Sequence, residues 1–536
     1  MVSEIQKTQK PPTSSIQEET SRYKEAAPTI AQEEEQTPAI AQKITFEDRT
    51  IKGCQNHSSA QGFSCAFDIS AENLGSADFK RDYGIKYAYI SGGMYRGIAS
   101  KELVIAMGKA GLMGFLGTAG LSLEQIERDI DAIQEALSER EAYGINLICD
   151  LSDPSMEMKT VELYLGKGIQ NIEAAAFMQI TPALVWYRLK GLCKDFQGAV
   201  HCKHRILAKI SRPEVAKAFM SPAPERIVSK LLSEGKISQE QAELSKQVPM
   251  SHDICVEADS GGHTDQGIAT VLLPSIQSLR KEMMNQYSDG KPLRLGLAGG
   301  LGTPEAAAAA FVMGADFIIT GSINQCTVEA GMSDAVKDLL QDINVQDTDY
   351  APAGDMFELG AKVQVLKKGV FFPARANKLF MLYNHYPSLE AIPESIRTQL
   401  QQKYFKKSFH EIWQETEEYF KTIGKKEEID KAHSNPKHKM ALVFRWYFGY
   451  TARLAFKGDE NNRVDYQVHT GPALGAFNQW VKGTELENWR NRHVDQIAEK
   501  LMKETAALLS ARMKKFLEKN ELAANQTHPA LATQRM

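Results

Sequence analysis

The stretch 293–322, LRLGLAGGLGTPEAAAAAFVMGADFIITGS, contains the pattern that decides the fold. An apolar run, Leu293–Ala298, ends in Gly299-Gly300 and is followed by a helix-favouring segment, Pro304–Met313. A second apolar run, Phe317–Thr320, ends in Gly321-Ser322. An apolar run, a glycine turn and an amphipathic segment in this order predict a β-strand, a loop and an α-helix.

The same alternation repeats along most of the chain. Eight apolar runs alternate with helix-like segments over roughly 240 residues, which matches a (β/α)8 barrel in count and length. We therefore expect an α/β protein with a TIM barrel, because the rival doubly wound sheet more often has about five or six strands. The expected strands are Ile85–Ile90, Leu112–Leu116, Ile145–Cys149, Ile169–Ala174, Ile206–Ile210, Ile254–Ala258, Leu293–Ala298 and Phe317–Thr320.

Composition changes along the chain and predicts three parts. Residues 1–44 are rich in Gln, Glu, Thr and Pro with few large apolar side chains, which is typical of a disordered polar tail. Residues 45–370 form the expected TIM-barrel domain, with a helical insertion at about 221–247 after the fifth strand. Residues 371–536 are poor in glycine and rich in Gln, Lys and Glu, and we expect a mainly helical C-terminal domain.

Charge and cysteine content argue against several classes of protein. The chain has 63 Lys and Arg against 67 Asp and Glu, and this net charge of −4 argues against nucleic-acid binding and polybasic membrane association. Seven widely spaced cysteines fit a reducing cytoplasm better than a disulfide framework. Met1–Ile40 lacks a signal-peptide pattern, and Val104–Leu121 contains too many glycines and a lysine to be a good transmembrane helix. We expect a cytoplasmic protein.

Glycine-rich sequences follow five of the expected strands. In a barrel, the loops after the strands build the active site, and glycines let a flat ligand approach the backbone. Phosphate sites recur after the seventh and eighth strands of this fold, and both loops together predict such a site here, although each glycine alone could simply form a tight turn. The candidate residues are Ser91, Gly92, Gly93 and Met94 after the first strand, Gly261 and Gly262 after the sixth, and Gly299, Gly300, Gly321 and Ser322 after the last two.

His263 is the outstanding titratable residue, because it follows Gly261-Gly262 at the mouth of the sixth strand. An imidazole there could donate a hydrogen bond to a carbonyl oxygen, stabilise an enolate or deliver a proton. The alternative is a histidine that only satisfies backbone groups in a turn.

Asn146 and Lys209 are polar residues within otherwise apolar strands. A lysine inside a barrel is costly to bury without an anion, so Lys209 could face an anionic flavin ring or a phosphate. Water at the barrel mouth or a neighbouring carboxylate is the alternative partner for either residue. No metal site is expected, because the cluster of Cys193, His201, Cys202 and His204 lacks the paired cysteine spacing of zinc sites.

Taken together, these loops resemble those of the nitronate monooxygenase-like flavoproteins, FMN-binding barrels that include bacterial FMN-dependent enoyl reductases. The similarity covers about Lys86–Asp342, and the histidine loop departs from the family's Glu-Ala-Gly-Gly-His form because Asp259 and Ser260 lengthen it. Two further segments, Phe357–Gly369 and Gly471–Trp480, look like those of the PfaD group. PfaD proteins are the trans-acting enoyl reductases of polyunsaturated fatty acid and polyketide synthases.

The resemblance implies an FMN-dependent oxidoreductase in which NADPH supplies the hydride that reduces the α,β double bond of an enoyl thioester on an acyl carrier protein. In this family His263 corresponds to the active-site histidine, expected to polarise the thioester carbonyl or assist protonation at the α-carbon. The flavin ring is expected near Gly92, Gly93, Met94 and Asn146, and the phosphate at Gly299, Gly300, Gly321 and Ser322. Ser91, Lys209, Gly261 and Gly262 complete the expected cofactor-binding set.

Two other functions stay open at this point: nitronate monooxygenase-type flavin oxidation, and a non-catalytic FMN-binding scaffold of a synthase. Carrier docking would give the helical C-terminal part a purpose. Lys362, Lys367, Lys368 and Arg375 are candidates for contacting an acidic carrier or the NADPH phosphate, with a solvated basic face as the alternative. The oligomeric state is undecided, and a homodimer is one option.

Overall fold

A computed structural model of the chain describes residues 68–150, 153–284 and 292–527, with side chains described as far as residue 517. The predicted disordered tail, residues 1–44, lies outside the described residues. All described residues belong to one compact unit.

Eight parallel strands close into a barrel, which confirms the predicted (β/α)8 fold. Each strand overlaps one of the predicted apolar runs, and the first begins at Tyr89, later than expected. In barrel order the strands are β1 (Tyr89–Ser91), β11 (Phe317–Thr320), β10 (Arg294–Ala298), β8 (Asp253–Glu257), β7 (Arg205–Ile210), β4 (Asn171–Ala175), β3 (Gly144–Ile148) and β2 (Met113–Leu116).

Large and small residues alternate across the barrel interior. A Cβ on Gly296 would lie 2.2 Å from the Phe317 ring, and a Cβ on Gly144 would lie 2.2 Å from the Phe115 ring. Glycine in these strands therefore makes room for a phenylalanine on the neighbouring strand, so that the interior is packed with side chains.

A helix follows each barrel strand. These helices are α2 (Lys101–Lys109), α3 (Leu123–Ala136), α4 (Pro154–Gly166), α5 (Pro182–Lys190), α6 (Pro213–Phe219), α9 (Ala269–Met284), α10 (Pro304–Val312) and α11 (Asp334–Leu340). The predicted insertion after the fifth barrel strand is confirmed as α7 (Glu225–Ser233) and α8 (Gln239–Leu244). A hairpin of β5 (Leu192–Lys194) and β6 (Val200–Cys202) was not predicted.

A second, antiparallel sheet of three strands lies beside the barrel. Its order is β12 (Thr348–Pro352), β13 (Lys362–Leu366) and β9 (Gly262–Thr264), and β9 comes from the loop after barrel strand β8. His263 is paired with Val363 in this sheet. The segment after the barrel therefore holds the backbone of the predicted histidine.

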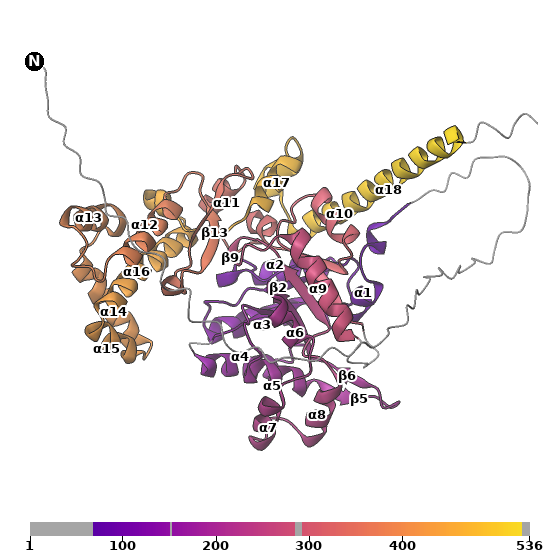
Figure 1. Cartoon of the computed structure of the whole chain (residues 1–536), viewed down its shortest axis with the longest axis horizontal. Coiled ribbons are helices and arrows are strands. Elements are labelled where there is room, and N and C mark those ends of the chain that lie inside the picture. The colour runs from indigo at the N-terminus through magenta and orange to yellow at the C-terminus, as the bar shows by residue number, and fades with distance from the viewer. Residues whose placement is uncertain (1–67, 151–152, 285–291, 528–536) are drawn as a thin grey trace, which may run out of the picture. The chain divides into compact units, whose positions relative to one another are not determined.

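The helical C-terminal part is confirmed, and its side chains fall into two cores. Five helices of this part lie together (Figure 1): α12 (Phe372–His385), α13 (Glu394–Gln399), α14 (Phe409–Thr422), α15 (Lys426–Ser434) and α16 (Pro436–Lys457). With β12 and β13 they form a core that contains Phe357, Phe372 and Phe444. From Leu454 onward the buried apolar side chains in the two cores belong to the barrel core instead. The limits predicted for the domains stay predictions.

Helix α18 (Val494–Thr527) runs along α10 on the outside of the barrel (Figure 1). Its apolar stripe buries Ile497 and Leu501, and Ser510 accepts a hydrogen bond from the Ile69 backbone N–H at 2.9 Å. The 9-residue helix α17 (Pro472–Trp480) precedes it and packs against the short helix η4 (Ser322–Cys326). Among the described helices, none is both long and apolar enough to cross a bilayer.

Candidate active site

The residues predicted from the loops lie at the carboxyl ends of the barrel strands. Ser91 ends β1 and is buried, and its Oγ accepts a hydrogen bond from Asn324 Nδ2 at 2.9 Å. The Gly92 N–H donates to the Thr320 carbonyl at 3.0 Å, which joins the loops after β1 and β11. The first and last strands therefore present their glycine loops side by side.

A buried carboxylate, Glu173 in the middle of β4, lies beside the loop that follows β1. Its Oε2 accepts hydrogen bonds from the Gly93 N–H at 3.0 Å and from Asn146 Nδ2 at 2.9 Å. Its Oε1 has no hydrogen-bond partner among the described residues, and the whole side chain is buried. A buried acceptor without a partner is costly, so this oxygen points to a donor group supplied by a ligand.

Lys209, on β7, contacts a second carboxylate at the same end of the barrel. Its Nζ lies 3.0 Å from Glu257 Oε1, so a neighbouring carboxylate, one of the alternatives at the sequence level, is a partner of this lysine. Burial lowers the pKa of Lys209, but Glu257 and Glu173 raise it further, and the ammonium form is favoured. Burial raises the pKa of Glu173 above its ordinary value, although Lys209 and Asn146 oppose this effect.

Several predicted glycines make room for protein atoms. A Cβ on Gly93 would lie 2.7 Å from Glu173 Oε2, and one on Gly92 would lie 3.2 Å from Glu173 Oε1. A Cβ on Gly261 would meet the Thr470 backbone at 2.8 Å, and one on Gly299 would meet the Ala258 carbonyl at 2.6 Å. Gly92 and Gly93 therefore make room for side chains of barrel strands, and Gly261 and Gly299 make room for the backbone of neighbouring segments.

Two predicted glycines face open space. A Cβ added to Gly300 or Gly321 would meet nothing within 4 Å, and the two residues follow the adjacent strands β10 and β11. Ser322 begins the short helix η4 directly after Gly321. Met94, by contrast, packs its backbone against Gly117, where a Cβ would lie 1.6 Å from the Met94 carbonyl oxygen.

His263 is half exposed at the mouth, with 48% of its side chain accessible. Its Nε2 lies 2.9 Å from Asp355 Oδ1, and its ring meets the His469 ring edge-on at a centroid distance of 6.4 Å. The His469 ring stacks on Tyr95 at 5.0 Å. Gly262 precedes His263 with φ of +87°, a conformation that favours glycine.

The lengthened histidine loop is tied to the second sheet by Asp259. Its Oδ1 accepts a hydrogen bond from Thr264 Oγ1 at 2.6 Å, and its Oδ2 accepts from the Tyr350 hydroxyl and from Gln364 Nε2. Asp259, one of the two extra residues, therefore fastens the loop that carries His263 to β12 and β13.

Three residues of the site were missed at the sequence level: Glu173, Asp355 and His469. Glu173 is a polar residue in the apolar strand Ile172–Ala175, as Asn146 is in the strand before it, so the same pattern could have identified Glu173. Asp355 and His469 reach the site from distant segments and carry no local pattern. Burial and the charge of His263 lower the pKa of His469 to about 4, so it is neutral near pH 7.

The four basic residues suggested for carrier or NADPH contact differ in their surroundings. Lys362, Lys367 and Lys368 are exposed. Arg375 instead pairs with the fully buried Asp465 and lies 4.9 Å over the Tyr404 ring. Arg375 therefore belongs to the packing of the helical part.

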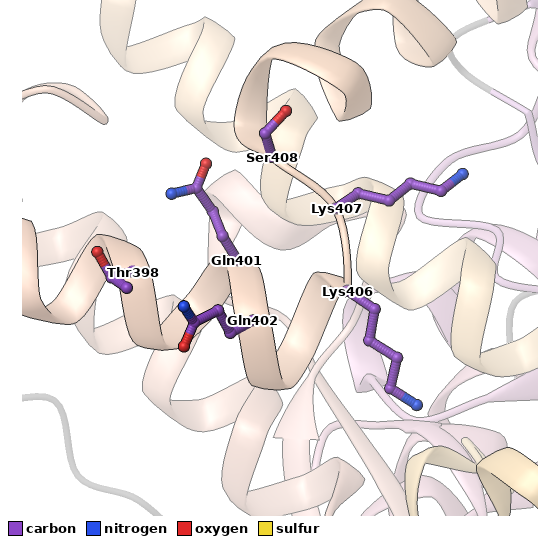
Figure 2. A pocket seen from close by; sticks show the side chains of 6 residues that line it. All are labelled: Thr398, Gln401, Gln402, Lys406, Lys407 and Ser408. Atoms are coloured by element: carbon purple, nitrogen blue, oxygen red, sulfur yellow. The ribbon is translucent and has the colours of Figure 1, made fainter.

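A pocket of about 440 Å³ lies in the helical part, around a π-helical turn at Leu400–Phe405. Figure 2 shows Lys406 and Lys407 extending away from Thr398, Gln401 and Gln402. Lys406 lies 3.7 Å from Asp465 Oδ2 and Lys407 pairs with Glu415, so both charges are already partnered. The pocket contains none of the predicted site residues.

Within the described ranges, no group of three His, Cys, Asp or Glu side chains is arranged to hold a metal ion. Cys193 and His201 are paired across the β5–β6 hairpin, and His201 contacts Asp195 at 2.8 Å.

Comparison with known proteins identifies the family. The structure matches the crystal structure of the enoyl reductase domain of MlnA, from the macrolactin biosynthesis cluster of Bacillus amyloliquefaciens, with a TM-score of 0.79 and 47% sequence identity. The match covers 83% of this chain and 99% of that domain. The chain belongs to the PfaD-type enoyl reductase family.

Two curated relatives of this PfaD-type chain are longer proteins of polyketide and polyunsaturated fatty acid synthesis. It is 58% identical to the polyketide biosynthesis protein PksE of Bacillus subtilis over 450 residues, which are 84% of this chain and 58% of PksE. It is 44% identical to one of the polyunsaturated fatty acid synthase proteins of Thraustochytrium over 418 residues, which are 77% of this chain and 28% of that protein. The chain therefore spans little more than half of PksE and less of the fatty acid synthase protein.

One family model matches the helical part of this PfaD-type chain. It describes the inserted helical domain of acyl-carrier-protein S-malonyltransferase and matches residues 386–466, which include α13 to α16.

Proposed function

We propose that this chain is an FMN-dependent enoyl reductase that uses NADPH to reduce the α,β double bond of an enoyl thioester carried by an acyl carrier protein. The observation that supports it most is the site itself: a half-exposed His263 beside buried polar atoms at the mouth of a barrel. The 47% identity to a domain described as an enoyl reductase supports the reaction class.

The residues at the mouth fit a flavin mononucleotide. Gly300 and Gly321 leave space for a phosphate after the seventh and eighth barrel strands, where such sites recur in this fold. Glu173 Oε1 lacks a partner among the described residues and is suited to accept a hydrogen bond from an N–H or O–H group of a ligand. The Lys209 ammonium supplies a half-buried positive charge suited to an electron-rich ring.

When bound, FMN would supply the two-electron chemistry that links NADPH oxidation to reduction of the double bond. The protein's part is to position the thioester and to manage charge and protons. As the hydride reaches the β-carbon, negative charge develops on the thioester oxygen. His263 donates a hydrogen bond to that oxygen, and a proton then adds to the α-carbon, so that NADPH and one proton are consumed for each double bond.

An acyl carrier protein is the proposed carrier of the thioester. Two observations support this choice: the relatives are named as a polyketide biosynthesis protein and a polyunsaturated fatty acid synthase subunit, and residues 386–466 match the inserted helical domain of acyl-carrier-protein S-malonyltransferase. A carrier on this side can present its substrate arm to the mouth beside Lys362, an exposed cation on β13.

The test is an anaerobic assay of the FMN-reconstituted protein with NADPH and a crotonyl or longer enoyl thioester on an acyl carrier protein. We expect NADPH oxidation that depends on the enoyl carrier and does not need oxygen. Oxygen-dependent turnover of an alkyl nitronate without enoyl reduction would point to nitronate oxidation instead. Flavin binding without turnover of any enoyl thioester would leave only a scaffold role.

A further inference from the structure

The His263 ring is held from outside the barrel. The backbone of His263 is fixed by its pairing with Val363 in the second sheet, and the ring is fixed by Asp355, whose Oδ1 lies 2.9 Å from Nε2. Asp355 is 92 residues away in the chain and follows strand β12. Of the two ring nitrogens of His263, Nε2 is the one with a hydrogen-bond partner among the described residues.

Asp355 is itself anchored by the helical part. A Cβ on the preceding residue, Gly354, would lie 2.7 Å from Phe448 Cβ of α16, so the chain at this point is pressed against that helix. Three residues after Asp355, Glu358 Oε1 lies 3.0 Å from Nδ1 of the buried His438, also on α16. The Ala353 N–H donates to the Ala361 carbonyl at 2.8 Å and closes the loop that carries the aspartate.

The charges around His263 favour its doubly protonated ring. Burial lowers the pKa of His263, but Asp355 and the more distant Glu257 raise it further, so that its pKa lies above the ordinary value. The neighbouring His469 ring is neutral near pH 7, because burial and the charge of His263 lower its pKa to about 4. Its Nε2 lies 2.8 Å from Gln467 Nε2, which gives it a partner of its own.

We propose that Asp355 is a positioning residue of the active site, which orients His263 through Nε2 and keeps it as an imidazolium whose Nδ1–H faces the thioester. This rests on the proposed function. A neutral imidazole has one N–H, so a ring that donates to Asp355 can also donate to a thioester oxygen only when it is charged. The helical part then serves the chemistry by holding the Asp355 loop in place.

The test compares Asp355→Asn with Asp355→Glu in the full-length protein, with Asp349→Asn as the matched control. Asp349 lies on β12, is exposed and accepts a hydrogen bond from the neighbouring Tyr350 N–H. The first measurement is the NMR titration of the His263 ring in histidine-labelled protein, assigned with His263→Gln. We expect Asp355→Asn to lower the midpoint by about 0.5–1 pH unit, Asp355→Glu to lower it by less, and Asp349→Asn to leave it unchanged.

The second measurement is the pH profile of kcat for enoyl reduction. Because the imidazolium is the active form, kcat falls as pH rises through the pKa of His263, and in Asp355→Asn this fall is expected at lower pH. An Asp355→Asn protein with an unchanged titration midpoint, or with kcat reduced equally at every pH, overturns the proposal. If Asp355→Asn does not fold, Asp355→Glu is the deciding variant, because its longer side chain displaces the carboxylate: a lowered midpoint supports the proposal and an unchanged midpoint overturns it.

The two proposals fail in different ways. A shifted titration in a protein without enoyl reduction keeps the positioning role and rejects the proposed function. An unshifted titration in an active reductase keeps the proposed function and rejects the positioning role.

Discussion

The two ends of the barrel differ in how completely their buried charged side chains are hydrogen-bonded. At the amino end, Arg294 donates to Asp253 at 2.6 and 3.0 Å and to Asp82 at 2.7 Å, and the Tyr83 hydroxyl donates to Asp253 at 2.9 Å. At the carboxyl end, Glu173 is equally buried and leaves one oxygen without a partner among the described residues.

This difference separates a structural end from a functional end. The amino-end cluster is complete, so it stabilises the fold and offers nothing to a ligand. An unpartnered buried carboxylate oxygen costs about 1–3 kcal/mol, and such a cost is expected where a ligand will supply the missing donor. The following predictions test whether the two ends differ in this way.

The largest effect is expected at the amino end. Arg294→Met removes the partner of the buried Asp253 and is expected to lower the free energy of unfolding by about 3–5 kcal/mol, because a buried charge is left uncompensated. Urea denaturation measures this loss. In the control, Arg81→Met breaks an exposed pair with Asp78 and should cost less than about 1 kcal/mol. Equal losses in both variants would contradict a structural role for the buried cluster.

The next effect is expected at the carboxyl end and on turnover. His263→Ala removes the proposed donor to the thioester oxygen and should lower kcat by about 10²–10³-fold while FMN remains bound. Steady-state kinetics and the flavin absorbance of the purified protein provide the two readings. His201→Ala, in the exposed β5–β6 hairpin, is the control and should change neither. Undiminished turnover in His263→Ala removes this residue from the mechanism.

Two glycines at the mouth provide a sharper comparison. Gly299 has φ of +91° and packs on the Ala258 carbonyl, so Gly299→Ala should lower the free energy of unfolding by about 2–3 kcal/mol. Gly321 faces open space, so Gly321→Ala should change stability by less than about 0.5 kcal/mol and instead weaken FMN binding. Thermal unfolding and a fluorescence titration of apoprotein with FMN separate the two effects. The reverse pattern would mean that Gly299 faces the ligand.

The smallest effect concerns the unpartnered oxygen. Glu173→Gln keeps one acceptor for Gly93 and Asn146 but replaces the second oxygen by a donor. FMN affinity should fall roughly tenfold, or about 1.4 kcal/mol, with stability nearly unchanged. The control is Asp129→Asn, a buried acid on α3 that accepts from Gln125 at 2.9 Å and should not affect FMN. Identical FMN affinity in wild type and Glu173→Gln would contradict a ligand contact at this oxygen.

The barrel could be predicted from the sequence because each of its strands is a local pattern. Eight apolar runs define the strands, five of them are followed by glycine-rich loops, and the strand order places Gly300 and Gly321 after neighbouring strands. The glycine pattern does not distinguish a residue that faces a ligand from one that faces protein, and Gly93 and Gly299 are of the second kind. That distinction depends on what packs opposite.

The residues around His263 could not be predicted in the same way. Asp355 and His469 meet it because the segments after the barrel return to the mouth, and such long-range contacts leave no periodic pattern in the sequence. The helical C-terminal part was predicted from its composition, but its division between two cores depends on which side chains meet in space. Asn146 and Glu173 are an intermediate case. Each can be recognised in the sequence as a polar residue in an apolar strand, but the hydrogen bond between them cannot be predicted from the sequence.

The most direct test of the account is the mass of an enoyl chain on an acyl carrier protein before and after anaerobic incubation with the FMN-loaded protein and NADPH. Intact-protein mass spectrometry should show a gain of about 2 Da on the carrier, the hydride and proton added across the double bond, and almost none with His263→Ala. An unchanged carrier mass with the FMN-loaded wild-type protein would contradict enoyl reduction at this barrel mouth.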